Sequence, residues 1–157
     1  MTSMSSLQKQ QASADPLLGT WKLQSFRMGY ADTGEEVESF GARPGGYLSY
    51  GSDGRMHAIV VRDDRKPPAG VPTDAEKIEL FNGMAAYAGT YTIDGDTVRH
   101  HVDISWIEAW TGTTQVRRFS IEGNVLYIRS PAARDPLNGR LSSAVLVWTK
   151  VLPAGPG

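Results

Sequence analysis

The chain contains no cysteine, and this absence excludes disulfide bonds, thiolate catalysis and cysteine-based zinc sites. A chain without cysteine suits a reducing compartment, so we expect a cytoplasmic protein. No hydrophobic run approaches the length of a transmembrane helix, and the first fifteen residues lack the apolar segment of a signal peptide. We therefore expect no membrane partner.

An excess of charge of either sign is also missing. Sixteen Lys and Arg residues stand against seventeen Asp and Glu residues, which gives a net charge of -1 and no field that would attract nucleic acid. Metal ligands are scarce, because there are only three histidines and the adjacent pair His100 and His101 points to opposite faces of a strand. Neither a Gly-x-Ser-x-Gly turn nor a glycine-rich loop before a helix is present. We expect no nucleic-acid partner, no metal and no other cofactor.

The sequence is instead rich in short apolar segments separated by Gly, Asp and Pro turns, which is typical of an antiparallel sheet. The predicted strands are residues 20–28, 46–50, 56–62, 86–94, 97–105, 115–122, 125–129 and 143–151, with a weaker one at 35–39. About eight strands joined in sequence predict an all-β fold, a single antiparallel up-and-down barrel. The barrel domain spans residues 16–151, between a disordered leader at 1–15 and a frayed tail at 152–157.

One helix is expected among these strands. Thr73 and Glu76 have the spacing of a capping box, and apolar residues recur at helical intervals from Ile78 up to about Ala85. Prolines at positions 67, 68 and 72 prevent an earlier start. We expect a short helix that covers one barrel end or an open seam, and a mobile lid is the alternative.

Two motifs at the ends of the predicted barrel are typical of small closed barrels. Gly19 and Trp21 open the first strand, where the glycine permits close approach of neighbouring backbone and the indole plugs one end of the interior. An apolar strand closes the chain at residues 146–151. Such a barrel usually leaves room for one small ligand.

Several short motifs carry a resemblance to a known family. They are GTWKL at 19–23, GYLSY at 46–50, SDGRM at 52–56, AYAGTY at 86–91, DGDTV at 94–98, HHV at 100–102 and LVW at 146–148. Together they resemble the bacterial and fungal lipocalin-like domain family, from Leu17 to about Val151. The resemblance implies a small lipocalin-type barrel, found alone or encoded near biosynthetic enzymes. It supplies no general catalytic motif to transfer.

Strand alternation predicts a polar cluster inside the barrel. His100 and Arg117 lie on the apolar faces of their strands, and Tyr87 and Tyr91 share an inward face. Burial and neighbours shift the pKa of His and Tyr, and an interior guanidinium can grip a carboxylate or enolate. His100, Tyr91 and Arg117 are therefore the candidate catalytic residues. In the structural alternative, the His and Tyr side chains only satisfy each other's hydrogen bonds, and Arg117 packs over the barrel tryptophan at the closed end.

Two tryptophans follow a predicted strand. Trp106 and Trp110 would either line a pocket mouth for a flat ligand or tuck beneath the helix. Arg62 either reaches inward or pairs at the surface with Asp63 or Asp64, and the side of the sheet that His57 occupies stays open. The candidate ligand-binding residues are Tyr50, Arg62, Tyr87, Trp106, Trp110 and Phe119.

Three functions fit these features. The first is a small-molecule binding barrel that takes an apolar or aromatic ligand. The second is a cofactor-independent enzyme that cyclises, isomerises or dehydrates a polyketide-like or terpenoid-like substrate, with His100, Tyr91 or Arg117 as acid, base or oxyanion partner. The third is an interaction module whose interior is filled by its tyrosines, Phe119 and Trp148. We expect a monomer or a homodimer.

Overall fold

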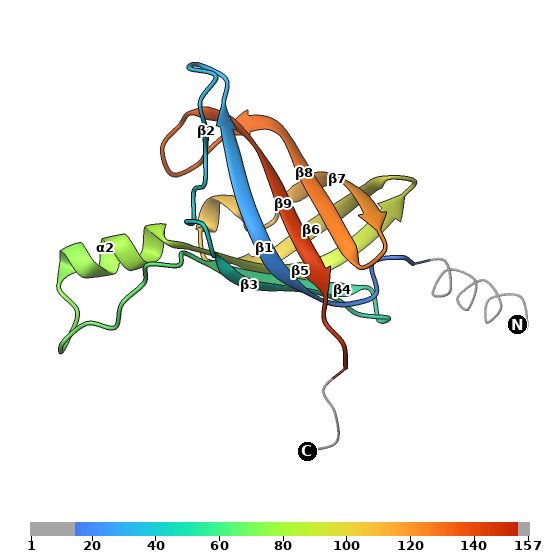
Figure 1. Ribbon diagram of the computed structural model, residues 1–157, viewed down its shortest axis with the longest axis horizontal. Helices are drawn as coiled ribbons and strands as arrows, with labels where there is room; N and C mark the ends of the chain where they lie inside the picture. Colours follow the sequence, from blue (N-terminus) through green and yellow to red (C-terminus); the bar gives the residue numbers. More distant parts are fainter. Residues whose placement is uncertain (1–14, 154–157) are drawn as a thin grey trace, which may run out of the picture.

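The computed structural model describes residues 15–153, and most of them form β-strands (Figure 1). The strands are β1 (Gly19–Tyr30), β2 (Glu36–Val37), β3 (Gly45–Tyr50), β4 (Arg55–Val61), β5 (Met84–Asp94), β6 (Thr97–Ser105), β7 (Thr114–Glu122), β8 (Val125–Arg134) and β9 (Leu141–Lys150). They pair antiparallel in the order β2-β1-β3-β4-β5-β6-β7-β8-β9, and β1 also pairs with β9. Eight strands therefore close into a barrel, and β2 is an extra strand beside β1. The predicted all-β up-and-down barrel is confirmed.

One end of the barrel, here called the closed end, carries the tight turns of β3–β4, β5–β6 and β7–β8 and the start of β1. Trp21 plugs it, as its indole N–H donates to the carbonyl oxygen of Leu17 at 2.9 Å and the Lys150 ammonium lies 4.5 Å from its ring centre. Gly19 has a φ of 114°, a conformation that side chains disfavour, and Lys150 occupies the space beside it. Leu17, Leu126 and Trp148 are at most 2% exposed. The interior at this end is filled.

The other end, here called the open end, carries the longer connections at residues 31–44, 62–83, 106–113 and 135–140. Inward-facing side chains near it, such as Phe26, Ala85 and Leu146, are only half-buried. Burial of the interior therefore falls from the closed end towards the open end. Connections between strands are where binding groups are usually placed.

The strand β5 bends where it crosses the barrel. Its pairing with β6 is shifted between Ala88 and Gly89, as in a β-bulge. A Cβ atom on Gly89 would collide with the carbonyl oxygen of His101, so only glycine fits this close backbone approach. The bulge separates Tyr87 from Tyr91 along the inward face of the strand.

The helix α2 (Asp74–Asn82) forms where the capping box predicts it. The Thr73 hydroxyl accepts a hydrogen bond from the Glu76 backbone N–H at 3.2 Å, and the Glu76 carboxylate accepts one from the Thr73 backbone N–H at 3.0 Å. None of its side chains is buried, and Ile78 is 62% exposed. The helix projects from the barrel (Figure 1, left) because the proline-rich segment before it carries the chain away from the strands. It does not seal an end or a seam.

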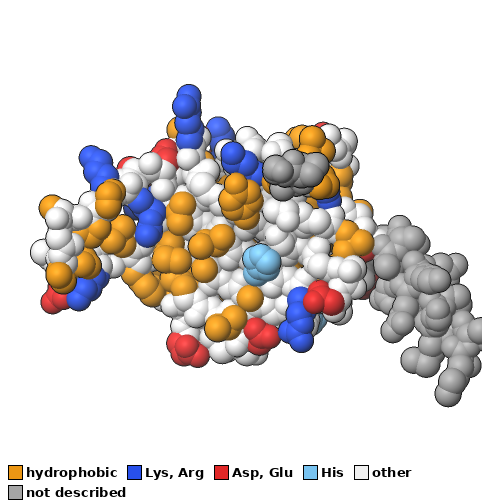
Figure 2. Space-filling model, turned by 90° about the horizontal axis from the view of Figure 1, so that it is seen from below, with side chains coloured by type: hydrophobic (Ala, Val, Ile, Leu, Met, Phe, Trp, Pro, Cys, Tyr) orange, Lys and Arg blue, Asp and Glu red, His pale blue; other side chains and the backbone are white. Residues whose placement is uncertain are grey.

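Hydrophobic side chains also gather on the outer wall of the barrel, on the face shown in Figure 2. Tyr47 on β3 lies directly opposite Ile59 on β4, and they are 48% and 45% exposed. His57 lies on this outward face as well, which settles the side that the sequence left open. In the described part of the chain, no helix has the length and apolar character needed to cross a membrane.

Candidate ligand-binding site

His100 is buried in the barrel interior, with 1% of its surface exposed. It lies on β6, opposite Tyr91 on β5 and opposite Gln115 on β7. Alternation along β6 turns His100 inward and His101 outward, as predicted from the sequence. A buried imidazole needs hydrogen-bond partners on both ring nitrogens.

Two tyrosines from different strands supply those partners. The Tyr50 hydroxyl, from the end of β3, lies 2.7 Å from Nε2 of His100. The Tyr87 hydroxyl, from β5, lies 2.8 Å from Nδ1. Both tyrosine rings are tilted against the imidazole, with centres 5.6 Å away. We call these three side chains the tyrosine–histidine cluster.

Burial keeps all three members of the tyrosine–histidine cluster uncharged. It lowers the pKa of His100 to about 3, and the nearby positive charge of Arg117 lowers it further. Burial raises the pKa of Tyr50 well above its usual value and raises that of Tyr87, although Arg117 opposes both shifts. Near neutral pH the cluster therefore consists of neutral hydrogen-bonding groups, and its histidine is a poor general base.

Arg117 lies on β7, half-buried and opposite Val98. Its guanidinium donates to the Val116 carbonyl oxygen at 2.9 Å and to Oε1 of Gln115 at 3.3 Å. The guanidinium carbon lies 6.0 Å from the centre of the Trp110 ring. Arg117 thus packs over a tryptophan of the open end, and not over Trp21 at the closed end. Gln115 was not among the predicted site residues, although it shares a strand face with Arg117.

The two tryptophans after β6 line the open end. The short 3-10 helix η1 (Glu108–Trp110) positions Trp110 edge-on to Tyr87, with ring centres 5.5 Å apart. Trp106 packs edge-on to Trp110 at 5.4 Å. The indole N–H of Trp106 is buried and has no hydrogen-bond partner among residues 15–153. These contacts place both rings beside the tyrosine–histidine cluster.

A family match accompanies this geometry. The family model for the lipocalin-like domain matches residues 18–151. The chain belongs to the lipocalin-like domain family. This confirms the resemblance found in the sequence motifs.

Two further comparisons complete this result. The chain is similar to a solved lipocalin-like protein from Bacteroides uniformis ATCC 8492, with 16% identity over 86% of this chain and 98% of that chain and a TM-score of 0.42. The curated proteins contain no match.

Besides Arg117 and the two tryptophans, three other predicted site residues of this lipocalin-like barrel lie outside the tyrosine–histidine cluster. The Tyr91 hydroxyl donates towards the Asp15 carboxylate and the Gly51 carbonyl oxygen, 3.0 Å from the latter, at the closed end. Phe119 is 9% exposed and packs into the core. Arg62 pairs with Asp64 at 3.4 Å, which is the surface alternative that the sequence allowed.

The predicted leader reaches into the described structure at one residue. Asp15 belongs to that leader, yet its carboxylate accepts hydrogen bonds from the Leu17 backbone N–H at 2.9 Å and from the Tyr91 hydroxyl. Residues 1–14 and 154–157, which make up the rest of the leader and most of the predicted tail, lie outside the described residues.

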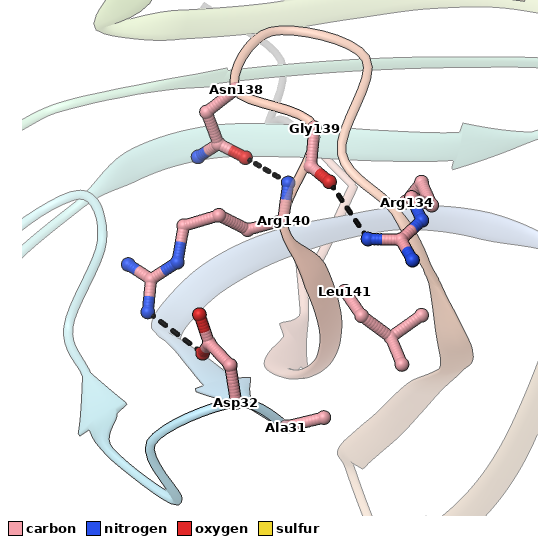
Figure 3. Close-up of a pocket in the computed structure, with 7 residues that line it drawn as sticks. All are labelled: Ala31, Asp32, Arg134, Asn138, Gly139, Arg140 and Leu141. Carbon is pink, nitrogen blue, oxygen red and sulfur yellow. Dashed lines mark hydrogen bonds and ion pairs between the residues drawn. The ribbon is translucent and has the colours of Figure 1, made fainter.

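A separate hollow of about 460 Å³ lies at the rim of the barrel (Figure 3). Arg140 closes one side of it, since its guanidinium pairs with Asp32 at 3.0 Å and stacks 3.6 Å from the Tyr30 ring centre. Arg134 donates to the Gly139 carbonyl oxygen at 3.1 Å. Both guanidinium groups are engaged within the protein, so this hollow offers little to an anion.

A second hollow of about 400 Å³ lies along β6, β7 and β8. It is lined by Thr97, Arg99, Val116, Arg118, Arg129, Ser130 and Pro131. Neither this hollow nor the one at the rim includes a member of the tyrosine–histidine cluster.

Within residues 15–153, no three His, Asp or Glu side chains come together as a metal site.

Proposed function

We propose that this lipocalin-like protein binds a small apolar or aromatic molecule at the open end of its barrel. The observation that carries the proposal is the convergence of Tyr87, Trp110 and Arg117, all half-buried, beside the buried imidazole of His100. Aromatic walls with a few positioned polar groups are typical of sites for small molecules.

The distribution of burial supports the open half of the barrel as the binding region. Trp21, Tyr50 and Trp148 are each 2% exposed and fill the closed half. We therefore place the ligand above them, where the interior residues are half-buried. The hydrogen-bonded histidine also supports a site, because a barrel that needs only a filled interior gains little from a buried polar group.

Binding is favoured over acid–base catalysis by the chemistry of the cluster. With its pKa lowered to about 3, His100 is neutral and too weakly basic to remove a proton efficiently near neutral pH. Tyr91, the second candidate acid, donates towards the closed end. If the protein were a cyclase or isomerase, it would have to polarise its substrate through hydrogen bonds from Tyr87 and Arg117.

Two experiments test binding. Native mass spectrometry of protein purified from its own host would detect a retained small molecule. Fluorescence titration with anilinonaphthalene sulfonate measures binding of an aromatic probe, and we expect Trp110→Ala to weaken it at least about tenfold.

The control is Tyr47→Ala, which removes a ring from the apolar outer wall and leaves the open end intact. We expect this variant to bind the probe as the unaltered protein does. If Tyr47→Ala abolished binding and Trp110→Ala did not, the probe would sit on the outer wall and the proposal would be wrong.

A further inference from the structure

The proton positions within the tyrosine–histidine cluster can be worked out from burial. A neutral imidazole has one N–H donor and one bare nitrogen that accepts. One tyrosine hydroxyl must therefore donate to His100, while the other accepts from it. The two distances, 2.7 Å for Tyr50 and 2.8 Å for Tyr87, are too similar to show which is which.

The surroundings of Tyr50 decide the direction. Tyr50 is 2% exposed, and among residues 15–153 the hydrogen-bond partner of its hydroxyl is Nε2 of His100. If Nε2 carried the proton, the Tyr50 hydroxyl would accept, and its own proton would have no acceptor among the described residues. A buried donor without an acceptor is strongly unfavourable. Tyr50 therefore donates to Nε2, and the imidazole proton is on Nδ1.

This arrangement leaves a hydroxyl proton on Tyr87. Nδ1 of His100 donates to the Tyr87 oxygen, so the Tyr87 O–H group donates no hydrogen bond within the cluster. Unlike Tyr50, Tyr87 is only half-buried, and it packs against Trp110 at the open end. The Tyr87 hydroxyl is thus a donor that is available to a bound molecule.

The neighbouring groups are donors as well. Arg117 has five N–H groups, of which two make the hydrogen bonds described above. The side-chain amide oxygen of Gln115 already accepts a hydrogen bond from Arg117. The Trp106 N–H is buried without a partner in the described chain. The described side chains next to the tyrosine–histidine cluster thus supply hydrogen-bond donors, from Tyr87, Arg117 and Trp106.

We infer that the ligand is a planar apolar molecule carrying an acceptor oxygen, a ketone or a carboxylate, which receives the Tyr87 hydroxyl and the Arg117 guanidinium while its ring lies against Trp110. This inference rests on the proposed function and narrows it to one chemical class. The same donor set disfavours amines and other cationic ligands, because their N–H groups would face donors and a positive charge.

The first test reads the proton position on His100 directly. A long-range ¹⁵N–¹H spectrum of the labelled protein distinguishes a protonated ring nitrogen from a bare one, and needs no ligand and no variant. We expect His100 to be protonated at Nδ1 and bare at Nε2. Protonation at Nε2 would overturn the inference, since Tyr87 would then donate to the ring and have no proton to offer.

The second test compares two probes of nearly equal shape, 2-acetylnaphthalene and 2-ethylnaphthalene, by tryptophan fluorescence. We expect the ketone to bind about tenfold more tightly, which is the usual size of one net hydrogen bond. Tyr87→Phe should remove the difference, because it removes the hydroxyl that donates to the ketone, and a far-UV circular dichroism spectrum shows whether this variant folds. The control Tyr47→Phe, on the outer wall, should preserve the tenfold preference.

The outcomes separate this inference from the proposed function. If both probes bind equally well and Trp110→Ala weakens both, the site binds small molecules but has no donor preference, and the inference is wrong. If neither probe binds, or if Trp110→Ala changes nothing, the proposed function fails and the inference fails with it.

Discussion

Tyr50 and His100 are 50 positions apart in the sequence, yet the hydroxyl of one lies 2.7 Å from Nε2 of the other inside the barrel. Their exposed fractions are 2% and 1%. Each of these polar side chains thus supplies a hydrogen-bond partner for the other where water is excluded. Burying either one without its partner would be unfavourable. This pair forms the inner half of the tyrosine–histidine cluster, which ties the stability of the barrel to the candidate site.

Tyr50→Phe should destabilise the protein by about 1–3 kcal/mol, because Nε2 of His100 would lose its buried partner. Urea unfolding monitored by tryptophan fluorescence measures the change. Tyr47→Phe removes an exposed hydroxyl from the same strand and should change stability by less than about 0.5 kcal/mol. Equal effects of the two variants would show that the buried hydrogen bond contributes nothing.

The stability of the protein should depend on pH through His100. Its folded pKa, about 3, lies below the ordinary value of 6.5, so above pH 6.5 both folded and unfolded forms are neutral and the full stability is present. As the pH falls from 6.5 towards 3, the unfolded chain binds a proton that the folded chain does not. Stability is therefore lost across this window, with a limiting slope of about 1.4 kcal/mol per pH unit from this group.

Urea unfolding at several pH values between 7 and 4 isolates that contribution by comparing variants. His100→Gln should remove this part of the slope, whereas His57→Gln, which changes an exposed imidazole on the outer wall, should keep it. Carboxylates contribute equally in both variants and cancel in the comparison. A His100→Gln slope identical to that of His57→Gln would contradict the prediction.

The sequence predicted the barrel and the inward direction of His100 because both follow from local rules. Alternation along a strand and the residues of tight turns determine which side chains face inward and which strands are neighbours. The same rules put Tyr87 and Tyr91 on one face but did not show that only Tyr87 reaches His100. Tyr91 lies directly opposite His100 and still donates towards Gly51, because side-chain direction depends on the whole three-dimensional packing.

The helix α2 likewise shows that local sequence rules predict an element but not its packing. Thr73 and Glu76 identify its start, since a capping box is a local arrangement. What an apolar helix face packs against is not local, and Ile78 remains 62% exposed. A pattern of apolar residues predicts a helix without saying whether the helix reaches the barrel.

Gly89→Ala should destabilise the barrel by about 3 kcal/mol or prevent folding. The added Cβ would meet the backbone of His101 and Asp103, which cannot move without disrupting the pairing of β5 with β6. The melting temperature and the yield of folded protein measure the effect. The control is Gly70→Ala, where a Cβ would meet nothing within 4 Å, and a similar loss in both variants would contradict the close-approach argument.

Thr73→Ala should loosen α2 while leaving the barrel unchanged. The substitution removes the hydroxyl that accepts from the Glu76 backbone N–H, and the loss of such a cap should accelerate amide exchange within residues 74–82 about fivefold. Because the helix buries no side chain, its opening exposes little apolar surface, and the urea midpoint of the barrel should not move. Glu79→Ala, in the same helix but outside the cap, should leave the exchange rates close to their original values. A shift of the urea midpoint in Thr73→Ala would instead show that α2 and the barrel unfold together, and the helix would then have to hold the open end in place.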